Sequence, residues 1–393
     1  MTAPSAPRLA PASPPHPPAF AATALTLGLA AASTGTAIPS LKPLAAHMPS
    51  FAGPSGFVVA HVAGGILAAW VLRRDQGHLF RNDRRGLVRV ALAGSLLLNL
   101  AMTQASSGAT LVGLRLLEGI CHVAAVSALM ASVHGAAALR RKHTAGLGAV
   151  LVLGVAAGLG LGGVFVHDGS PTRCFSLAAG LAAVALLTSM KVPSARGQGL
   201  TPAPSGFPSG ASWAPALVVA AERLAMGLLT VLVPLSAPSP RQAASLLGSL
   251  MLTSVAGIPL ARRLADRLGA ARVVQLGVVI LSSALLASGL LHPFFGSGAV
   301  VWAVAVGLGA AAVFSGALMQ VSEGSEAERL RGMGLVHAFG ALGFLMGSSL
   351  AGVAAAVTTE ATALEGLLAL GAPVMWAASL ASRRLDRPAP AAA

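Results

Sequence analysis

Twelve apolar stretches, separated by short polar gaps, account for most of this 393-residue chain. Most of them reach the roughly 20 residues that an α-helix needs to cross the ~30 Å hydrocarbon core of a bilayer. Inside that core every backbone N–H and C=O must be paired within the protein, which a helix achieves by itself. The pattern therefore predicts an all-α membrane protein with twelve transmembrane helices, over residues 20–45, 55–72, 90–105, 109–135, 145–167, 174–190, 213–235, 243–261, 273–291, 298–321, 332–357 and 361–382.

The basic residues fall almost entirely in alternate gaps between these stretches. When the start of the chain is counted as the first gap, the odd gaps and tails hold 21 of the 26 Lys and Arg residues, whereas the even gaps hold only Arg173 and Arg241. Because Lys and Arg stay on the cytoplasmic side during insertion, we expect a multi-pass protein of the plasma (inner) membrane with both termini cytoplasmic. Anionic lipid at that face is an expected partner of the basic loops.

Composition argues against several other classes of protein. The chain is 55% hydrophobic and 10% charged, with mean hydropathy +0.77, whereas soluble domains are about one quarter charged. The formal charge of +14 does not indicate nucleic-acid binding, because the basic clusters lack interleaved aromatic residues that could stack on bases. The chain has no phosphate-binding loop ending in Gly-Lys-Ser/Thr and no cluster of metal ligands in sequence. We therefore expect no cofactor, no metal and no enzymatic activity.

The longest polar gap, Val192–Ser212, is rich in Pro, Gly and Ser and divides the apolar stretches into six and six. This composition is typical of a flexible linker, and two halves with equal helix numbers indicate an internal duplication. A short echo between Gly35-Thr-Ala-Ile-Pro39 and the segment Gly227–Pro234 supports the duplication. We expect two pseudo-symmetric six-helix bundles over 20–191 and 213–383, joined by a cytoplasmic linker over 192–212, with a disordered tail over 1–19 and a second tail over 384–393.

The fifth stretch carries regularly spaced glycines, in the run Gly154-Val-Ala-Ala-Gly158-Leu-Gly-Leu-Gly162-Gly163. Glycines at 154, 158 and 162 form one flat stripe that another helix can approach closely. The run resembles the Gly-x-x-x-Gly-Pro-x-x-Gly-Gly motif of the proton-coupled drug and metabolite exporters of the major facilitator superfamily, with Leu159 in place of the proline. The resemblance covers nearly the whole chain and implies two helix bundles around a central cavity. Ordinary close packing of Gly-rich helices is the alternative explanation.

A second motif follows the eighth stretch. The segment Leu264-Ala-Asp266-Arg267-Leu-Gly269 resembles the superfamily's cytoplasmic Gly-x-Leu-x-Asp-Arg-x-Gly loop, with Arg262 in place of the leading glycine. An Asp and an Arg in a short loop can brace helix ends through charges that separate when a transporter changes state; a solvated turn is the alternative. The first half carries only a degraded version, Arg73-Arg-Asp-Gln-Gly77, in which the Asp-to-Gly spacing is one residue short.

Charged residues within the fourth stretch point to function. Arg115, Glu118 and His122 recur at i, i+3 and i+7, which places them on one face of a helix. Glu118 is expected about 14 Å from the outer surface, close to the midplane, where a charge normally faces a water-filled cavity or a partner. The segment Arg115–Gly119 also resembles the superfamily's Arg-x-x-x-Gly motif, which the resemblance ties to proton transfer. A structural Arg–Glu pair beside a core histidine is the alternative.

The seventh stretch offers a counterpart in the second half. Glu222 and Arg223 are expected about 14 Å from the inner surface. Adjacent helical residues point about 100° apart, which leaves Glu222 freer to take a proton than Glu118, whose arginine is aligned with it. By the resemblance, helices four and seven line the central cavity. We therefore expect the charged residues of both helices along the path of proton and substrate, with a purely structural role for Glu222 and Arg223 as the alternative.

Other polar residues within the stretches stand alone in sequence. His61, His337, Asn99 and Gln320 are expected to form hydrogen bonds between helices. Lys42 lies near the outer end of the first stretch, where it either extends to the interface or takes part in a gate.

Together these features predict a secondary active transporter of a small organic compound that works by alternating access, one bundle rocking against the other. The glycine motif favours proton-coupled antiport that exports the compound, from a protein that we expect to be monomeric. A proton-coupled importer is the alternative within the class. A membrane enzyme or a scaffold is the alternative outside it.

Overall fold

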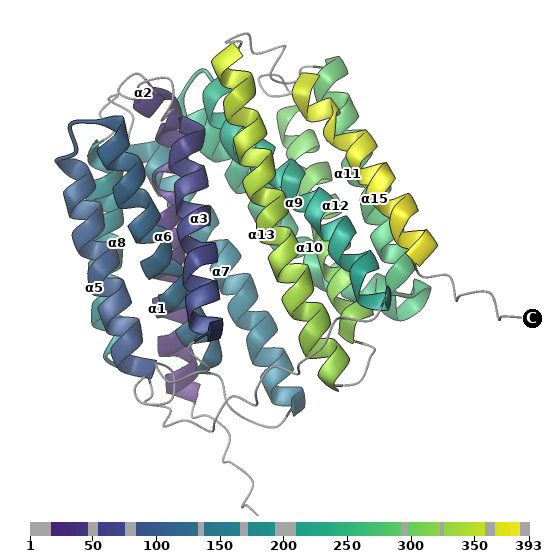
Figure 1. The fold of residues 1–393 in the computed structure, drawn as a ribbon, viewed down its shortest axis with the longest axis horizontal. Coiled ribbons are helices and arrows are strands. Elements are labelled where there is room, and N and C mark those ends of the chain that lie inside the picture. Colours follow the sequence, from purple (N-terminus) through teal and green to yellow (C-terminus); the bar gives the residue numbers. More distant parts are fainter. Residues whose placement is uncertain are drawn as a thin grey trace, which may run out of the picture.

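The computed structural model describes residues 17–45, 54–74, 84–132, 137–165, 172–192, 210–291, 298–322, 326–357 and 366–385, and nearly all of them are helical (Figure 1). The first half contains α1 (Pro17–Gly35), η1 (Ile38–Ser40), α2 (Leu41–Ala45), α3 (Pro54–Arg74), α5 (Arg84–Thr103), α6 (Gly108–Ala131), α7 (Ala137–Phe165) and α8 (Thr172–Ser189). The second half contains α9 (Gly210–Ser236), α10 (Pro240–Leu268), α11 (Ala270–Leu291), α12 (Ala299–Ser322), α13 (Glu326–Val357) and α15 (Gly371–Leu385).

The predicted all-α membrane fold is confirmed. Within the described residues, eleven helical segments are long and apolar enough to cross a membrane, and the twelfth apolar segment, Gly366–Ser382, is shorter. The first span is not one continuous helix, because the chain changes to a 3-10 turn at Ile38–Ser40, where Pro39 lacks the N–H that a helix interior needs.

Several helices are longer than their apolar stretches. The helix α9 begins at Gly210, inside the linker expected over 192–212, and α7 begins at Ala137 rather than at 145. The expected tails and linker otherwise fall on 1–16, 193–209 and 386–393, which lie outside the described residues. Their boundaries stay predictions.

The prediction that Asp266 and Arg267 lie in a loop is wrong. Both residues lie in the last turn of α10, which runs on to Leu268, and α11 begins at Ala270. Only Gly269 separates the two helices, and its φ of 87° is a backbone conformation that side-chain-bearing residues rarely adopt. The chain therefore turns at one glycine, and no extended loop is needed.

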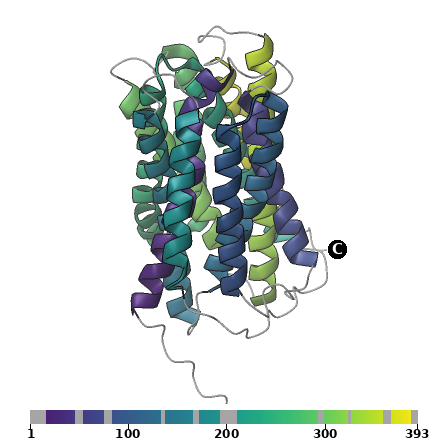
Figure 2. The same cartoon turned by 90° about the vertical axis from the view of Figure 1, so that its left-hand side faces the viewer.

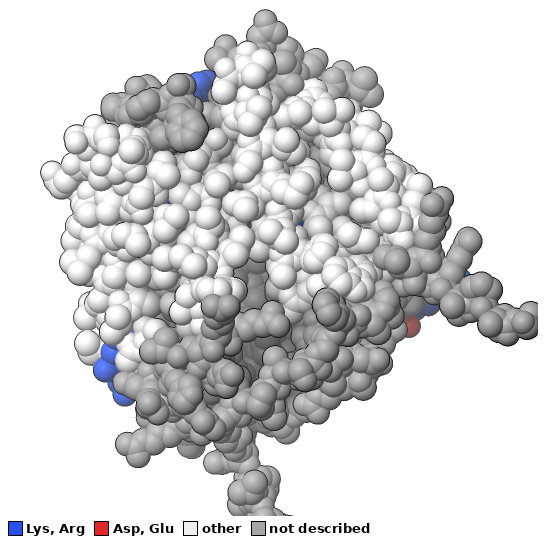
Figure 3. Space-filling model, in the orientation of Figure 1, with Lys and Arg blue, Asp and Glu red and all other residues white. Residues whose placement is uncertain are grey.

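The helices run side by side between two ends of the molecule (Figures 1 and 2). We call one the Lys42 end, where α2 lies, and the other the arginine end, which carries described basic residues such as Arg85, Arg89, Arg262 and Arg272. On the face drawn in Figure 3, the broad middle is almost free of charged atoms, which gather at the margins. Large apolar side chains such as Val90, Val301 and Val353 are 65–71% exposed, as lipid contact requires.

The two halves repeat the same helix packing. In the first half α1 packs on α7 and α8, and α3 packs on α6; in the second half α9 packs on α13 and α15, and α10 packs on α12. The pairs α5·α6 and α5·α8 likewise correspond to α11·α12 and α11·α15. This correspondence between elements of the two halves is the pseudo-symmetry expected from the duplicated sequence.

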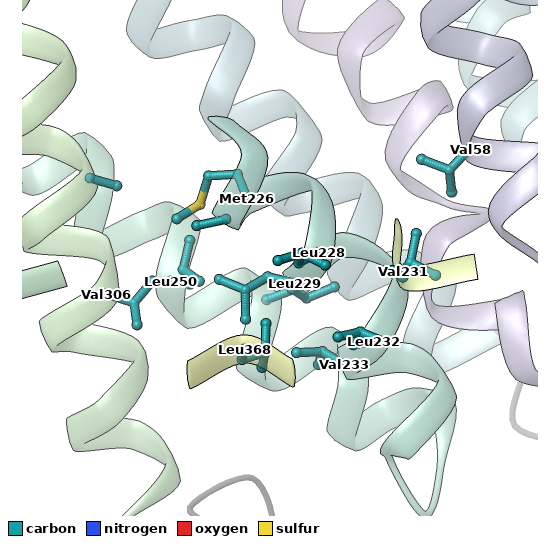
Figure 4. Packing of buried hydrophobic residues seen from close by; sticks show 14 of the residues in the cluster. Val58, Met226, Leu228, Leu229, Val231, Leu232, Val233, Leu250, Val306 and Leu368 are labelled. Carbon is teal, nitrogen blue, oxygen red and sulfur yellow. The ribbon is translucent and has the colours of Figure 1, made fainter. Parts of the chain in front are cut away.

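The two halves share a hydrophobic core at the Lys42 end, whereas the first half has a core of its own toward the arginine end. The core built around α9 includes first-half residues close to the Lys42 end of their helices, among them Leu41, Phe57, Met102, Leu111 and Phe175. Figure 4 shows part of this core, where Met226, Leu229 and Leu232 of α9 gather with Leu250, Val306 and Leu368, while Val58 comes from α3. Toward the arginine end the first half has its own core, which includes Leu27, Leu92, Leu129 and Leu147.

Polar and small residues complete the closure at the Lys42 end. The Lys42 ammonium donates a hydrogen bond to the Ala237 carbonyl oxygen across the two halves, at 3.0 Å. Gly163 of α7 packs directly on Ala244 of α10, and Gly352 of α13 packs on Ser55 of α3. If the arginine end is cytoplasmic, as the positive-inside rule predicts, this conformation is closed to the outside.

Candidate functional site

The glycine stripe of α7 packs against α1. A Cβ added at Gly158 would lie 2.8 Å from the carbonyl carbon of Ala32, and one at Gly162 would lie 2.9 Å from that of Thr36. One at Gly154 would lie 2.8 Å from the Cβ of Ala31. The stripe predicted from sequence is therefore a close helix contact, and it faces the protein rather than lipid.

The second half contains the same contact without the sequence motif. A Cβ added at Gly343 of α13 would lie 2.9 Å from the carbonyl carbon of Ala220, and one at Gly347 would lie 2.8 Å from that of Leu224. Gly163 differs from the rest of the run because it contacts the other half. Since both halves use such glycines for packing, close helix approach accounts for Gly154, Gly158 and Gly162 without reference to the motif.

A second close approach, between α3 and α6, assembles the charged site of the first half. A Cβ at Gly64 would lie 3.0 Å from the carbonyl carbon of Leu116, and one at Gly119 would lie 3.0 Å from the Cα of His61. The two helices both start at the Lys42 end and run in the same direction. This geometry brings His61 of α3 beside Glu118 of α6.

Glu118 is the centre of this first cluster, and its side chain is fully buried. Its Oε2 atom accepts a hydrogen bond from Arg115 Nη1 at 2.9 Å and lies 2.8 Å from His61 Nδ1. Arg115 also donates from Nη2 to the Thr34 carbonyl oxygen at 3.1 Å, and its guanidinium lies 4.8 Å from the centre of the Phe57 ring. The cluster thus ties α1, α3 and α6 together.

His122 completes the first cluster. Its Nδ1 lies 3.0 Å from the Thr34 hydroxyl, and its ring centre lies 5.4 Å from that of His61. The predicted alignment of Arg115, Glu118 and His122 on one helix face is confirmed. The Oε1 atom of Glu118 and the Nε atom of Arg115 are buried without a hydrogen-bond partner in the described structure. Such groups are costly when unpaired, and water or a ligand can supply an acceptor for Nε and a donor for Oε1.

His61 is the functional candidate that the sequence did not single out. It was expected to form a bond between helices, which is confirmed, but its partner was unknown. The prediction of a bond between helices is wrong for Asn99, because its side chain donates to the Ser95 carbonyl oxygen within its own helix. A usable signal for His61 was its depth, roughly 10 Å from the start of α3, which is within about one helical turn of the depth of Glu118 in α6.

In the second half, Glu222 and Arg223 lie together on α9. Glu222 is 1% exposed, and its Oε2 atom lies 3.2 Å from Arg223 Nε without the geometry of a hydrogen bond. The expectation that Arg223 points away from its neighbour is wrong, because the long arginine side chain bends back toward the carboxylate. The two Cβ atoms diverge as predicted, but four flexible torsions bring the charges together.

The Arg223 side chain is 34% exposed, unlike the other three charges at this depth. Its guanidinium lies 4.7 Å from the centre of the Phe314 ring of α12, and that ring lies 6.5 Å from the His337 ring of α13. Gly340 provides space beside the arginine, since a Cβ there would lie 3.4 Å from Arg223 Cγ.

The two clusters occupy different helices of the repeat. The glycine contacts of the two halves match when Gly35 is paired with Gly227, Gly154 with Gly343 and Gly158 with Gly347, which makes Ala30 the counterpart of Glu222 and Ala31 the counterpart of Arg223. The first cluster contacts α1 at Thr34, one helical turn beyond Ala30, through Arg115 and His122. No hydrogen bond or ion pair joins them among the described side chains.

Asp266, Arg267 and Gly269 lie away from both clusters, at the arginine end. Asp266 and Arg267 are exposed on the last turn of α10, and neither forms an ion pair with a described residue. A bracing role for these charges stays a prediction. Within the described residues, no group of three or more His, Cys, Asp or Glu side chains gathers in a way that could hold a metal ion.

Comparison with solved structures identifies the class of fold. The nucleoside transporter NupG superposes with a TM-score of 0.70 at 12% identity, over 94% of this chain and 99% of that one. The human organic anion transporter MFSD10 superposes with a TM-score of 0.67 at 19% identity, over 94% and 100%. A bacterial homolog of the human lysosomal transporter Spinster, in an inward-facing and unoccupied conformation, gives 0.67 at 14%, over 96% and 100%.

Sequence comparison gives a family match for the second half of the chain. Residues 215–393 match the Major Facilitator Superfamily, whereas no curated protein matches the chain. The chain thus has the fold of major facilitator transporters, and its second half carries the superfamily's sequence signature. The fold is the one that the family resemblance implied, while membership of the exporter branch stays a prediction.

Proposed function

We propose that this protein is a secondary active transporter that moves a small organic compound by alternating access, coupled to protons. The observation that carries the proposal is the pair of buried charged clusters, Arg115–Glu118 with two histidines in one half and Glu222–Arg223 in the other. Ionisable groups at this depth are expensive in a membrane, and they normally mark an ion or substrate path. The major facilitator fold supports the same conclusion.

Glu222 is our candidate for the carboxylate that exchanges its proton. Its charge is balanced by one ion pair without a hydrogen bond, whereas Glu118 accepts from Arg115 and also contacts His61. Burial disfavours a charged carboxylate, and close cationic partners oppose that effect. Because Glu118 has more partners, we assign it with Arg115, His61 and His122 to a relay or gating role.

Two modes of coupling have support. The glycine motif of α7 favours antiport and export by resemblance, although the equivalent packing in α9·α13 shows that close helix contact can account for it. The Glu222–Arg223 pair favours symport of an anion, because an anion that takes Arg223 leaves Glu222 free to be protonated. The fold does not select a substrate, since similar structures include a transporter named for nucleosides and one named for organic anions.

Purified protein in liposomes tests the coupling. A deletion strain and an overexpressing strain, compared on a panel of compounds, first identify the transported compound by changed tolerance or growth. In liposomes, Glu222→Gln should abolish uptake or release driven by a pH gradient and keep exchange of the compound between the two sides. If gradient-driven transport survives in Glu222→Gln and fails in Glu118→Gln, the assignments are reversed. If it survives in both variants, proton coupling through these residues is wrong.

The direction of the gradient separates the two modes. In symport, protons and the compound cross the membrane in the same direction. In antiport, they cross it in opposite directions. The same liposomes, prepared once with an acidic interior and once with an acidic exterior, therefore distinguish export by antiport from import by symport.

A further inference from the structure

Arg223 has a much more exposed side chain than Arg115, Glu118 and Glu222. The side chains of Arg115, Glu118 and Glu222 are at most 4% exposed, whereas that of Arg223 is 34% exposed. Its Nε faces Glu222, and neither terminal nitrogen forms a hydrogen bond with a described residue. Two N–H-bearing nitrogens of a permanent cation are thus available at mid-depth.

The surroundings of Arg223 fit an anion attached to an apolar or aromatic body. The guanidinium carbon lies over the Phe314 ring, 4.7 Å from its centre, and this cation–π contact helps to hold the guanidinium in place. A guanidinium edge matches a carboxylate through two parallel hydrogen bonds. The exposed His337, which contacts the same ring, adds a further group that can donate to an anion.

Charge at this site favours an anion over a cation. Glu222, the acidic partner, is buried on α9, while the groups that are open are Arg223 and His337. Helix α12, which supplies Phe314, contains no ionisable residue over its whole length. A cationic compound would therefore meet the open guanidinium before it could reach the carboxylate.

We propose that Arg223 binds the carboxylate of an organic anion at a site that also includes Phe314 and His337. When the anion is absent, Glu222 pairs with the Arg223 guanidinium. This inference rests on the proposed transport function, because it takes the site between α9, α12 and α13 as the substrate site. It names the substrate class as carboxylates with an aromatic or apolar body. A neutral amide of the same shape loses the charge-assisted bonds, worth about ten- to a hundredfold in affinity.

The internal carboxylate links anion binding to a proton. A charged Glu222 competes with the anion for Arg223 and repels it, so a neutral Glu222 should bind the anion more tightly. By linkage, the anion then favours protonation of Glu222 to the same extent. The described titratable groups on elements packed against α9 are His337 on α13, Lys42 on α2, His61 on α3 and the charged ends of α10, and Arg223 is the charged group closest to Glu222.

The test measures equilibrium binding to purified protein in detergent, without any gradient. Three probes of matched size differ in charge: benzoate, benzamide and benzylammonium. We expect wild-type protein to bind benzoate at least about tenfold more tightly than benzamide, and benzylammonium most weakly. Arg223→Gln should remove the preference for benzoate, and Arg223→Lys should keep part of it. Arg262→Gln, which changes an exposed arginine at the arginine end, is the matched control and should bind like wild type.

Glu222→Gln distinguishes an anion site from a merely structural arginine. Without the internal competitor, benzoate should bind several-fold more tightly than to wild type, with a weaker dependence on pH. A protein that does not prefer benzoate to benzamide, or an Arg223→Gln variant that keeps this preference, overturns the proposal. Weaker benzoate binding in Glu222→Gln also contradicts it. A failure of proton-coupled transport in liposomes leaves these equilibrium results unchanged, so the two proposals can fail separately.

Discussion

Replacing Gly158 by alanine tests the close contact between α7 and α1 with the smallest possible change. The added methyl group would lie 2.8 Å from the carbonyl carbon of Ala32 and 2.9 Å from its Cα, whereas ordinary contacts of Cβ atoms begin at 3.4 Å. The obstacle is backbone, which cannot rotate away as a side chain can. The two helices must therefore separate by at least about 0.6 Å along this contact, the difference between 3.4 and 2.8 Å.

Two opposing terms set the size of the effect. Overpacking by one methyl group costs about 1–3 kcal/mol, and the rigid backbone obstacle at Gly158 favours the upper part of that range. Alanine also stabilises a helix interior relative to glycine by about 1 kcal/mol. Gly160 lies on the same helix, is exposed and has no atom within 4 Å of an added Cβ, so Gly160→Ala gains the helix term alone. We expect Gly158→Ala to be less stable than Gly160→Ala by about 2–3 kcal/mol.

Unfolding of both variants in detergent, by heat or by added denaturing detergent, measures this difference. Gly343→Ala repeats the test in the second half, where the added methyl meets the Ala220 backbone. Gly158→Leu, a larger change at the same position, should abolish transport while the protein still inserts in the membrane. If Gly158→Ala and Gly160→Ala are equally stable, the two helices are not in the contact described here, and the packing explanation of the glycine run is refuted.

Two further predictions concern the ends of the molecule, and both use cysteine variants in a background without the native Cys121 and Cys174. Lys42→Gln removes the hydrogen bond that joins the two halves. An impermeant thiol reagent should then label a cysteine at the buried position 40 (Ser40→Cys) about two- to fivefold faster, as expected for the loss of one exposed charged contact. An unchanged labelling rate would show that Lys42 does not hold this end closed. Lys142→Cys should be protected from the same reagent in intact cells and Gly169→Cys should be labelled, because basic residues concentrate in alternate gaps. Labelling in the opposite sense would invert the orientation.

Much of the architecture could be predicted from the order of residues alone, because a bilayer imposes strong local conditions. Every membrane-crossing segment must be apolar, long enough and internally hydrogen-bonded, and these requirements can be recognised in the sequence without knowledge of neighbouring helices. Depth along a helix follows from residue number, so Glu118 and Glu222 could be placed near mid-membrane. The glycine stripe at 154, 158 and 162 follows from helical periodicity in the same way.

Partners across helices depended on tertiary structure. The bond between His61 and Glu118 exists because Gly64 and Gly119 let α3 and α6 approach closely, and nothing near His61 in sequence indicates which helix it meets.

The contact of Arg223 with Glu222 likewise depends on a flexible side chain that bends back along α9, although the direction of its Cβ predicts separation. Periodicity fixes where a side chain starts, whereas packing against Phe314 and Gly340 decides where a long side chain ends. The closure of the halves at the Lys42 end also depends on tertiary structure. The sequence of a transporter must support both an open and a closed state. Only the contacts between α7 and α10 and between α3 and α13 show which state is present.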